Sequence, residues 1–136
     1  MSYTIQEKTD ILKELIAMAH ADDHLKKEEV EFIKAIASRI EVDEEQLRIM
    51  LDNPDKEPVQ PPKQFVKRII HFHRLMLMMH IDGNVDDSEL QLLHEIALRY
   101  GIRGLTVNKL LSTMEKYPHG EIPPSELLEI HSETSN

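Results

Sequence analysis

The sequence contains no cysteine and no tryptophan, and only three phenylalanines, three tyrosines and four glycines occur among its 136 residues. Without cysteine the chain cannot form disulfides, thiolate metal sites or a cysteine nucleophile. It also lacks a glycine-rich phosphate loop, a GxSxG elbow and an ordered pair of nucleophile and base. The few aromatic residues leave leucine, isoleucine and seven methionines to fill a core, which suits packed helices better than a β-sandwich.

Targeting and membrane signals are also missing. The N-terminus has no basic segment followed by an apolar one, and the longest apolar run, residues 75–79, is far too short to cross a bilayer. We therefore expect a soluble, cytoplasmic protein with no direct membrane insertion. The formal net charge of −9 repels phosphate backbones and favours cations or basic protein surfaces. A protein partner is expected and nucleic-acid binding is not, while the oligomeric state stays open.

Apolar residues recur at helical spacing along the chain, and no segment shows the alternation of a strand. Seven helices are predicted, over about residues 5–21, 30–40, 43–52, 62–80, 86–100 and 106–116, with a short one from 124. Residues 52–62 are predicted to form a loop rather than a domain linker. The predicted helix starts are marked by Thr4 with Glu7, Asp43, Asp86 with Glu89, and Thr106, and Gly101 marks a helix end.

Residues 15–42 and 75–102 align without a gap, which indicates an internal duplication because the period of about 60 lies outside the usual solenoid range. We expect one domain over residues 1–136, with residues 132–136 forming a frayed tail. The predicted fold class is all-α, with about seven helices. Two helical hairpins, related by a pseudo-twofold axis, are each followed by a short helix, and a further short helix ends the chain.

An acidic turn recurs in both copies, as HADDHLKKEE at residues 20–29 and HIDGNVDDSE at residues 80–89. Helix capping explains Glu89, because Asp86 stands at the partner position of a capping box. It explains Glu29 poorly, since the equivalent position holds Lys26, which cannot accept a hydrogen bond from an amide. A glutamate repeated without its capping partner suggests a second role.

Asp22 and Asp82 fall near the C-terminal ends of predicted helices, where the helix dipole disfavours a carboxylate. Turn formation could account for them, as could pairing with the repeated Arg39 and Arg99 or a bound cation. Two carboxylates about 4 Å apart repel by roughly 4 kcal/mol at an effective dielectric of about 20, so a converging pair needs compensation. A structural cluster and a cation site therefore both remain open.

A metal site would draw its ligands from both turns. Oxygen donors alone favour Ca²⁺, Mg²⁺ or Mn²⁺, whereas histidine donors shift the preference toward Zn²⁺. The histidines have a simpler explanation as well, because a histidine in the last turn of a helix interacts favourably with the dipole. The candidate ligands are Asp22, Glu29, Asp82 and Glu89, with His20 and His80 as further donors.

The segment MMHIDGNVDDSEL at residues 78–90, followed by IALRYGI at residues 96–102, resembles the signature of the tellurite-resistance TerB-like family. The first copy repeats this pattern with Asp23 in place of the glycine. The resemblance implies a compact all-helical domain of two related halves, whose acidic residues form a cluster proposed to bind a metal. It also implies an accessory rather than catalytic role in tellurite-resistance or stress-response systems.

These expectations combine into one hypothesis and two alternatives. The leading hypothesis is a TerB-like accessory module whose acidic cluster binds a divalent cation, mediates protein interaction, or does both. The alternative is a metal-free structural or protein-interaction domain with an arginine-paired acidic cluster. A metal-dependent hydrolase is a third option, but it needs an open coordination site and a substrate cleft, for which the sequence offers no candidate.

Overall fold

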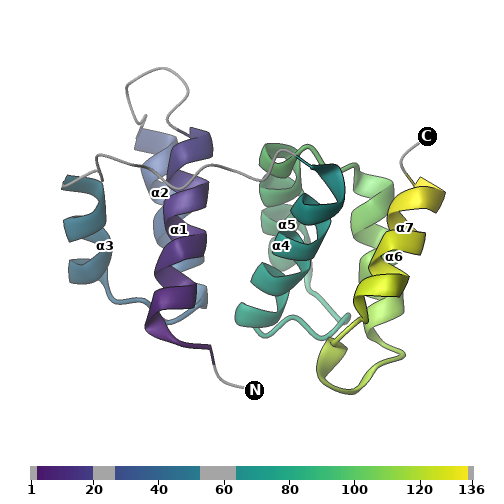
Figure 1. The fold of residues 1–136 in the computed structure, drawn as a ribbon. Coiled ribbons are helices and arrows are strands. Elements are labelled where there is room, and N and C mark those ends of the chain that lie inside the picture. The colour runs from purple at the N-terminus through teal and green to yellow at the C-terminus, as the bar shows by residue number, and fades with distance from the viewer. Residues whose placement is uncertain (1–2, 20–26, 53–63, 135–136) are drawn as a thin grey trace. The chain divides into compact units, whose positions relative to one another are not determined.

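The computed structural model describes residues 3–19, 27–52 and 64–134. These residues form seven α-helices and one short 3-10 helix, and they contain no β-strand (Figure 1). The predicted all-α class with about seven helices is confirmed. The chain divides into two compact units, residues 1–61 and 62–136, each of which holds one copy of the duplicated sequence.

The first unit contains α1 (Ile5–Ala19), α2 (Lys27–Arg39) and α3 (Glu44–Asp52), with α2 packed against both α1 and α3. The predicted capping box starts α1, because the Glu7 amide donates to Thr4 Oγ1 at 3.1 Å and the Thr4 amide donates to Glu7 Oε1 at 3.0 Å. The apolar positions at helical spacing are buried and form the core. They include Leu12, Leu15, Ile33, Ile36 and Leu47.

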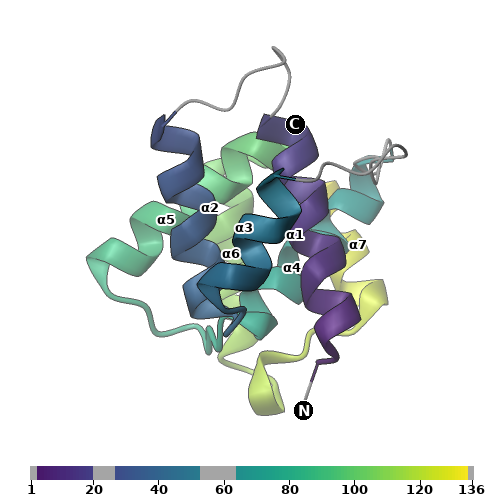
Figure 2. The same ribbon diagram turned by 90° about the vertical axis from the view of Figure 1, so that its left-hand side faces the viewer.

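The second unit contains α4 (Phe65–Met78), α5 (Asp87–Tyr100), α6 (Gly104–Met114), the 3-10 helix η1 (Pro118–Gly120) and α7 (Pro124–Thr134). Helix α4 packs against α5 and α7, and α6 packs against the same two helices (Figure 2). Phe72 and Tyr100 are fully buried and meet edge to face, with ring centroids 6.1 Å apart. The second core therefore has an aromatic centre, whereas the buried side chains of the first are mainly aliphatic.

The duplication extends to the ends of the helices. Helices α1, α2 and α3 begin at residues 5, 27 and 44, and α4, α5 and α6 begin 60 positions later, at residues 65, 87 and 104. Glu41 follows α2 and Gly101 follows α5, and both residues are in the left-handed region, at φ 63° and 70°. In each case the residue after the left-handed one donates the same long hydrogen bond back to the helix, from the Val42 amide to the Ala37 carbonyl oxygen (2.9 Å) and from the Ile102 amide to the Ala97 carbonyl oxygen (2.8 Å).

Some predicted boundaries need correction. Helix α6 begins at Gly104, so Thr106 is not its cap. Thr106 is buried instead and donates to Thr134 Oγ1 at 2.7 Å, while Thr134 Oγ1 donates to the Ile130 carbonyl oxygen at 2.6 Å. These bonds fasten the last turn of α7, which therefore continues through Thr134 into the segment where fraying was expected.

Several other predicted helix boundaries fall at or beyond the ends of the ranges that the structure describes. Helix α4 begins at Phe65, later than predicted, and α1 is described only to Ala19. Of the predicted loop over 52–62, only Asp52 belongs to the described residues, and it ends α3. Among the helices of the described part, none combines the length and hydrophobicity needed to cross a membrane.

Candidate functional site

The acidic turn of the second unit follows directly from the end of α4. The Ile81 amide donates to the Met76 carbonyl oxygen at 3.0 Å, which closes α4 with a left-handed residue between them. That residue is His80, at φ 61°, and its side chain is exposed. His80 therefore lies beyond the last helical turn rather than within it, at a backbone position that usually favours glycine.

The carboxylates that follow His80 are held by local hydrogen bonds. Asp82 Oδ1 accepts from the Asn84 amide at 3.0 Å, so Asp82 forms a turn outside the helix and escapes the unfavourable dipole. Asp86 Oδ1 accepts from the Glu89 amide at 2.7 Å and from Ser88 Oγ at 2.9 Å. The predicted cap at Asp86 is confirmed, and both aspartates are exposed to solvent.

Gly83 holds this turn against α6. Its φ is 97°, and a Cβ atom added there would lie 2.7 Å from Glu115 Cγ and 2.8 Å from the Leu111 carbonyl oxygen. Both the backbone conformation and the close approach therefore require glycine. The resemblance to the TerB signature includes this residue, so its Asp-Gly pair has a physical explanation in the second unit. Asp23, the equivalent residue, lies outside the described part.

The first acidic turn is only partly described. His20 and Asp22 lie outside the described residues, whereas Glu29 lies in the first turn of α2. The Oε2 atom of Glu29 is buried and has no hydrogen-bond partner within the described part of the chain. A buried carboxylate oxygen without such a partner is costly, which marks this position as one that a cation or donor could satisfy.

The predicted metal ligands do not form a complete site in the described residues. Glu89 is half-buried at the start of α5, and Arg99 Nη1 donates to the Glu95 carbonyl oxygen at 3.1 Å. Within residues 3–19, 27–52 and 64–134, no group of three or more histidine, aspartate or glutamate side chains could hold a metal ion. The six-residue ligand set stays a prediction, because two of its members fall outside these ranges.

A buried histidine in α4 was missed by sequence reasoning. His73 Nε2 lies 3.0 Å from the Gly120 carbonyl oxygen and 3.4 Å from the Ile122 amide nitrogen. Because a carbonyl can only accept, the shorter contact assigns the proton to Nε2. Burial lowers the pKa of His73 below its ordinary value of 6.5, which the bond to Gly120 and the charge of Glu121 offset only in part. His73 thus ties α4 to the last residue of η1, a contact across 47 residues that periodicity cannot predict.

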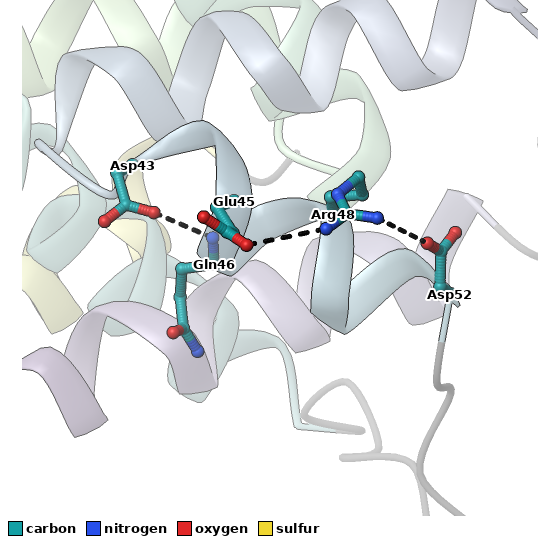
Figure 3. Close-up of polar contacts among 5 residues, drawn as sticks. All are labelled: Asp43, Glu45, Gln46, Arg48 and Asp52. Carbon is teal, nitrogen blue, oxygen red and sulfur yellow. Dashed lines mark hydrogen bonds and ion pairs between the residues drawn. The ribbon is translucent and has the colours of Figure 1, made fainter.

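A groove of about 380 Å³ lies where α2 meets α3. Asp43, at its edge, caps α3 by accepting from the Gln46 amide at 2.7 Å, and farther along α3 Arg48 lies between Glu45 and Asp52, at 3.5 and 3.8 Å (Figure 3). The only cation among the groove's lining residues is Lys34. The remaining lining residues are Ala37, Ser38, Glu41, Val42, Asp43, Glu44 and Leu47.

No protein-family model matches the chain, and no solved structure gives a significant match.

Proposed function

We propose that this protein is a TerB-like accessory module that binds a basic protein surface through its acidic turn, without catalysis and without needing a metal. The proposal rests on the hydrogen bonding and the solvent exposure of the carboxylates in the second turn. Asp82 and Asp86 accept hydrogen bonds from neighbouring amides while remaining exposed. A turn whose charges are compensated locally can fold without a cation and still present negative charge to a partner.

The electrostatics of the chain support a basic partner. The net charge is −9, and Asp87 adds a third exposed carboxylate beside Asp82 and Asp86. Exposed charges are screened beyond about 8 Å at physiological ionic strength, so such binding should weaken as salt is added. Because complementary charge mainly speeds the encounter of two proteins, added salt should lower the association rate constant more than it raises the dissociation rate constant.

The link to a stress or tellurite-resistance system comes from the resemblance of residues 78–90 and 96–102 to the TerB signature. Disrupting the gene and measuring growth with and without tellurite tests this part of the proposal. We expect impaired growth under tellurite or another oxidative stress, restored by the intact chain. Unchanged growth under every stress tested would remove the stress-system assignment but not the binding role.

Binding is tested by isolating the partner with the tagged chain and then titrating the purified pair in a calorimeter at several salt concentrations. We expect Asp82→Asn with Asp87→Asn to weaken binding and reduce its salt dependence, because both changes remove charge from the turn. Glu129→Gln with Glu133→Gln removes the same charge from exposed positions on α7 and serves as the matched control. Equal effects of the two double variants would argue against recognition by the turn.

A cation at the first turn is the second candidate function, and Glu29 is the specific observation that favours it. Its buried Oε2 lacks a partner within the described residues, and a divalent cation is one group that would satisfy it. Glu29→Gln should then abolish any stabilisation that a cation gives to the chelated protein. If the variant retains the full cation response, Glu29 is not a ligand.

A further inference from the structure

Each unit has a corner where its second helix meets its third, α2 with α3 in the first unit and α5 with α6 in the second. The charged side chains at this corner are mainly acidic in the first unit and basic in the second. The groove residues of the first unit, between positions 34 and 47, correspond to positions 94 to 107 in the second unit, where α5 meets α6. The backbone is shared, since both corners turn through a left-handed residue and begin the next helix at the same position. The side chains differ, so the duplicated corner has diverged in its surface chemistry.

In the first unit the corner is an acidic groove. Ala37, Val42 and Leu47 supply apolar lining, and all three are buried. Glu41 and Glu44 stand at the edge with exposed side chains, and neither forms an ion pair within the described part of the chain. Asp43 adds a third carboxylate against the single ammonium of Lys34, so the groove suits an aliphatic side chain flanked by positive charge.

In the second unit the corner carries arginines and exposed leucines. Leu98 stands where the groove has Ser38, and it is 77% exposed. Arg103 stands where the groove has Asp43, and its Nη1 donates to the Thr134 carbonyl oxygen at 3.1 Å. Arg68 Nη1 approaches to 3.3 Å of the position that a Cβ on Gly101 would take. Leu105, 56% exposed, lies in the first turn of α6. The second corner thus offers aliphatic side chains beside guanidinium groups, which is the chemistry that the groove suits.

We propose that the α5–α6 corner of one copy of this chain docks into the α2–α3 groove of a second copy. Leu98 enters the apolar part of the groove, while the arginines face Glu41 and Glu44. The contact joins different surfaces of the two copies, so the pair keeps one free groove on one copy and one free corner on the other, and assembly is open-ended. This proposal uses residues outside the acidic turns and does not depend on the function proposed above.

Two variants test this contact because each removes one side of it. The groove variant carries Glu41→Lys and Glu44→Lys, and the corner variant carries Leu98→Ser and Leu105→Ser. All four residues are exposed, so both variants should fold, which circular dichroism checks. The assay is sedimentation velocity of the full chain over a concentration series at low and high salt.

We expect the average mass of the wild-type chain to rise with concentration and to fall when salt is added, because the contact is partly electrostatic. Each variant alone should remain monomeric. An equimolar mixture should form a dimer and nothing larger, because the intact corner of one variant fills the intact groove of the other. The proposal is overturned if the wild-type chain stays monomeric at concentrations near 1 mM, if either variant alone associates like the wild type, or if the mixture stays monomeric.

Discussion

Acidification should destabilise the protein through His73, whose neutral imidazole donates from Nε2 to the Gly120 carbonyl oxygen. A second proton must enter at Nδ1, within a buried ring, and burial lowers the pKa of His73 below 6.5. The unfolded chain then binds this proton more readily than the folded one. The free energy of unfolding is therefore fully retained above about pH 6.5 and falls as the pH drops below that value.

The size of the effect follows from linkage. Each unit by which the folded-state pKa of His73 lies below its unfolded value removes about 1.4 kcal/mol at low pH. For a domain of this length, 1 kcal/mol corresponds to a midpoint shift of roughly 4 °C. The loss should level off once the pH falls below the folded-state pKa, because both states then carry the proton.

The assay is urea unfolding, followed by circular dichroism, at a series of pH values between about 5 and 8. His73→Gln is the matched control, since its amide can still donate to Gly120 but does not titrate. Other titrating groups act in both proteins, so the difference between the two curves isolates His73. Parallel curves, or a wild-type protein that gains stability relative to the variant as the pH falls, would refute this reasoning.

Three further changes give separate expectations, each measured by the same unfolding assay at neutral pH. His80→Gly should raise stability by about 1 kcal/mol, because glycine suits the left-handed position at the end of α4; a loss would mean that the imidazole makes a stabilising contact. Gly83→Ala should lower stability by about 1–3 kcal/mol through strain and collision with α6, and a neutral result would contradict the close approach described. Thr134→Val should cost about 1–3 kcal/mol by leaving Thr106 without its acceptor, and adding Thr106→Val should cost less than the sum, whereas strict additivity would exclude their hydrogen bond.

Much of the helical architecture could be predicted because its causes are local. The capping box of Thr4, the caps at Asp43 and Asp86, and the left-handed end at Gly101 depend on residues within one turn of each helix. The gap-free alignment likewise carried the boundaries of one unit over to the other. The pseudo-twofold relation between the units stays a prediction.

The errors arose where a distant contact outweighed a local preference. Threonine is a residue type that often caps helices, but the hydroxyl of Thr106 is buried against Thr134, which lies 28 residues away in the sequence. The role of His73 was not predicted for the same reason, since its partner Gly120, in η1, lies 47 residues away in the sequence. Local patterns contain no information about such pairs.

The sequence was sufficient to predict which acidic residues form the candidate site, but not whether those residues bind a metal. The repeated Asp and Glu positions pointed to the acidic turns, and turn formation, one of the explanations considered for Asp82, is confirmed by its bond to the Asn84 amide. Asp82 does not meet the unfavourable end of the α4 dipole, because the chain leaves the helix at His80. Metal binding by the complete six-residue set stays a prediction, because sequence spacing alone does not fix the distances among its carboxylates.

The central claim, that the second acidic turn works without a metal, is tested most directly by thermal unfolding of the chelated protein with and without Ca²⁺, Mg²⁺, Mn²⁺ or Zn²⁺. A ligand specific for the folded state adds about 2.7 kcal/mol at 100 times its dissociation constant, which is readily measured as a midpoint shift. We expect no cation to raise the midpoint through this turn, so that any response is the same in the wild type and in the Asp82→Asn, Glu89→Gln variant. A cation that raises the wild-type midpoint, with the rise abolished in that variant, would contradict the claim and make the turn a metal site.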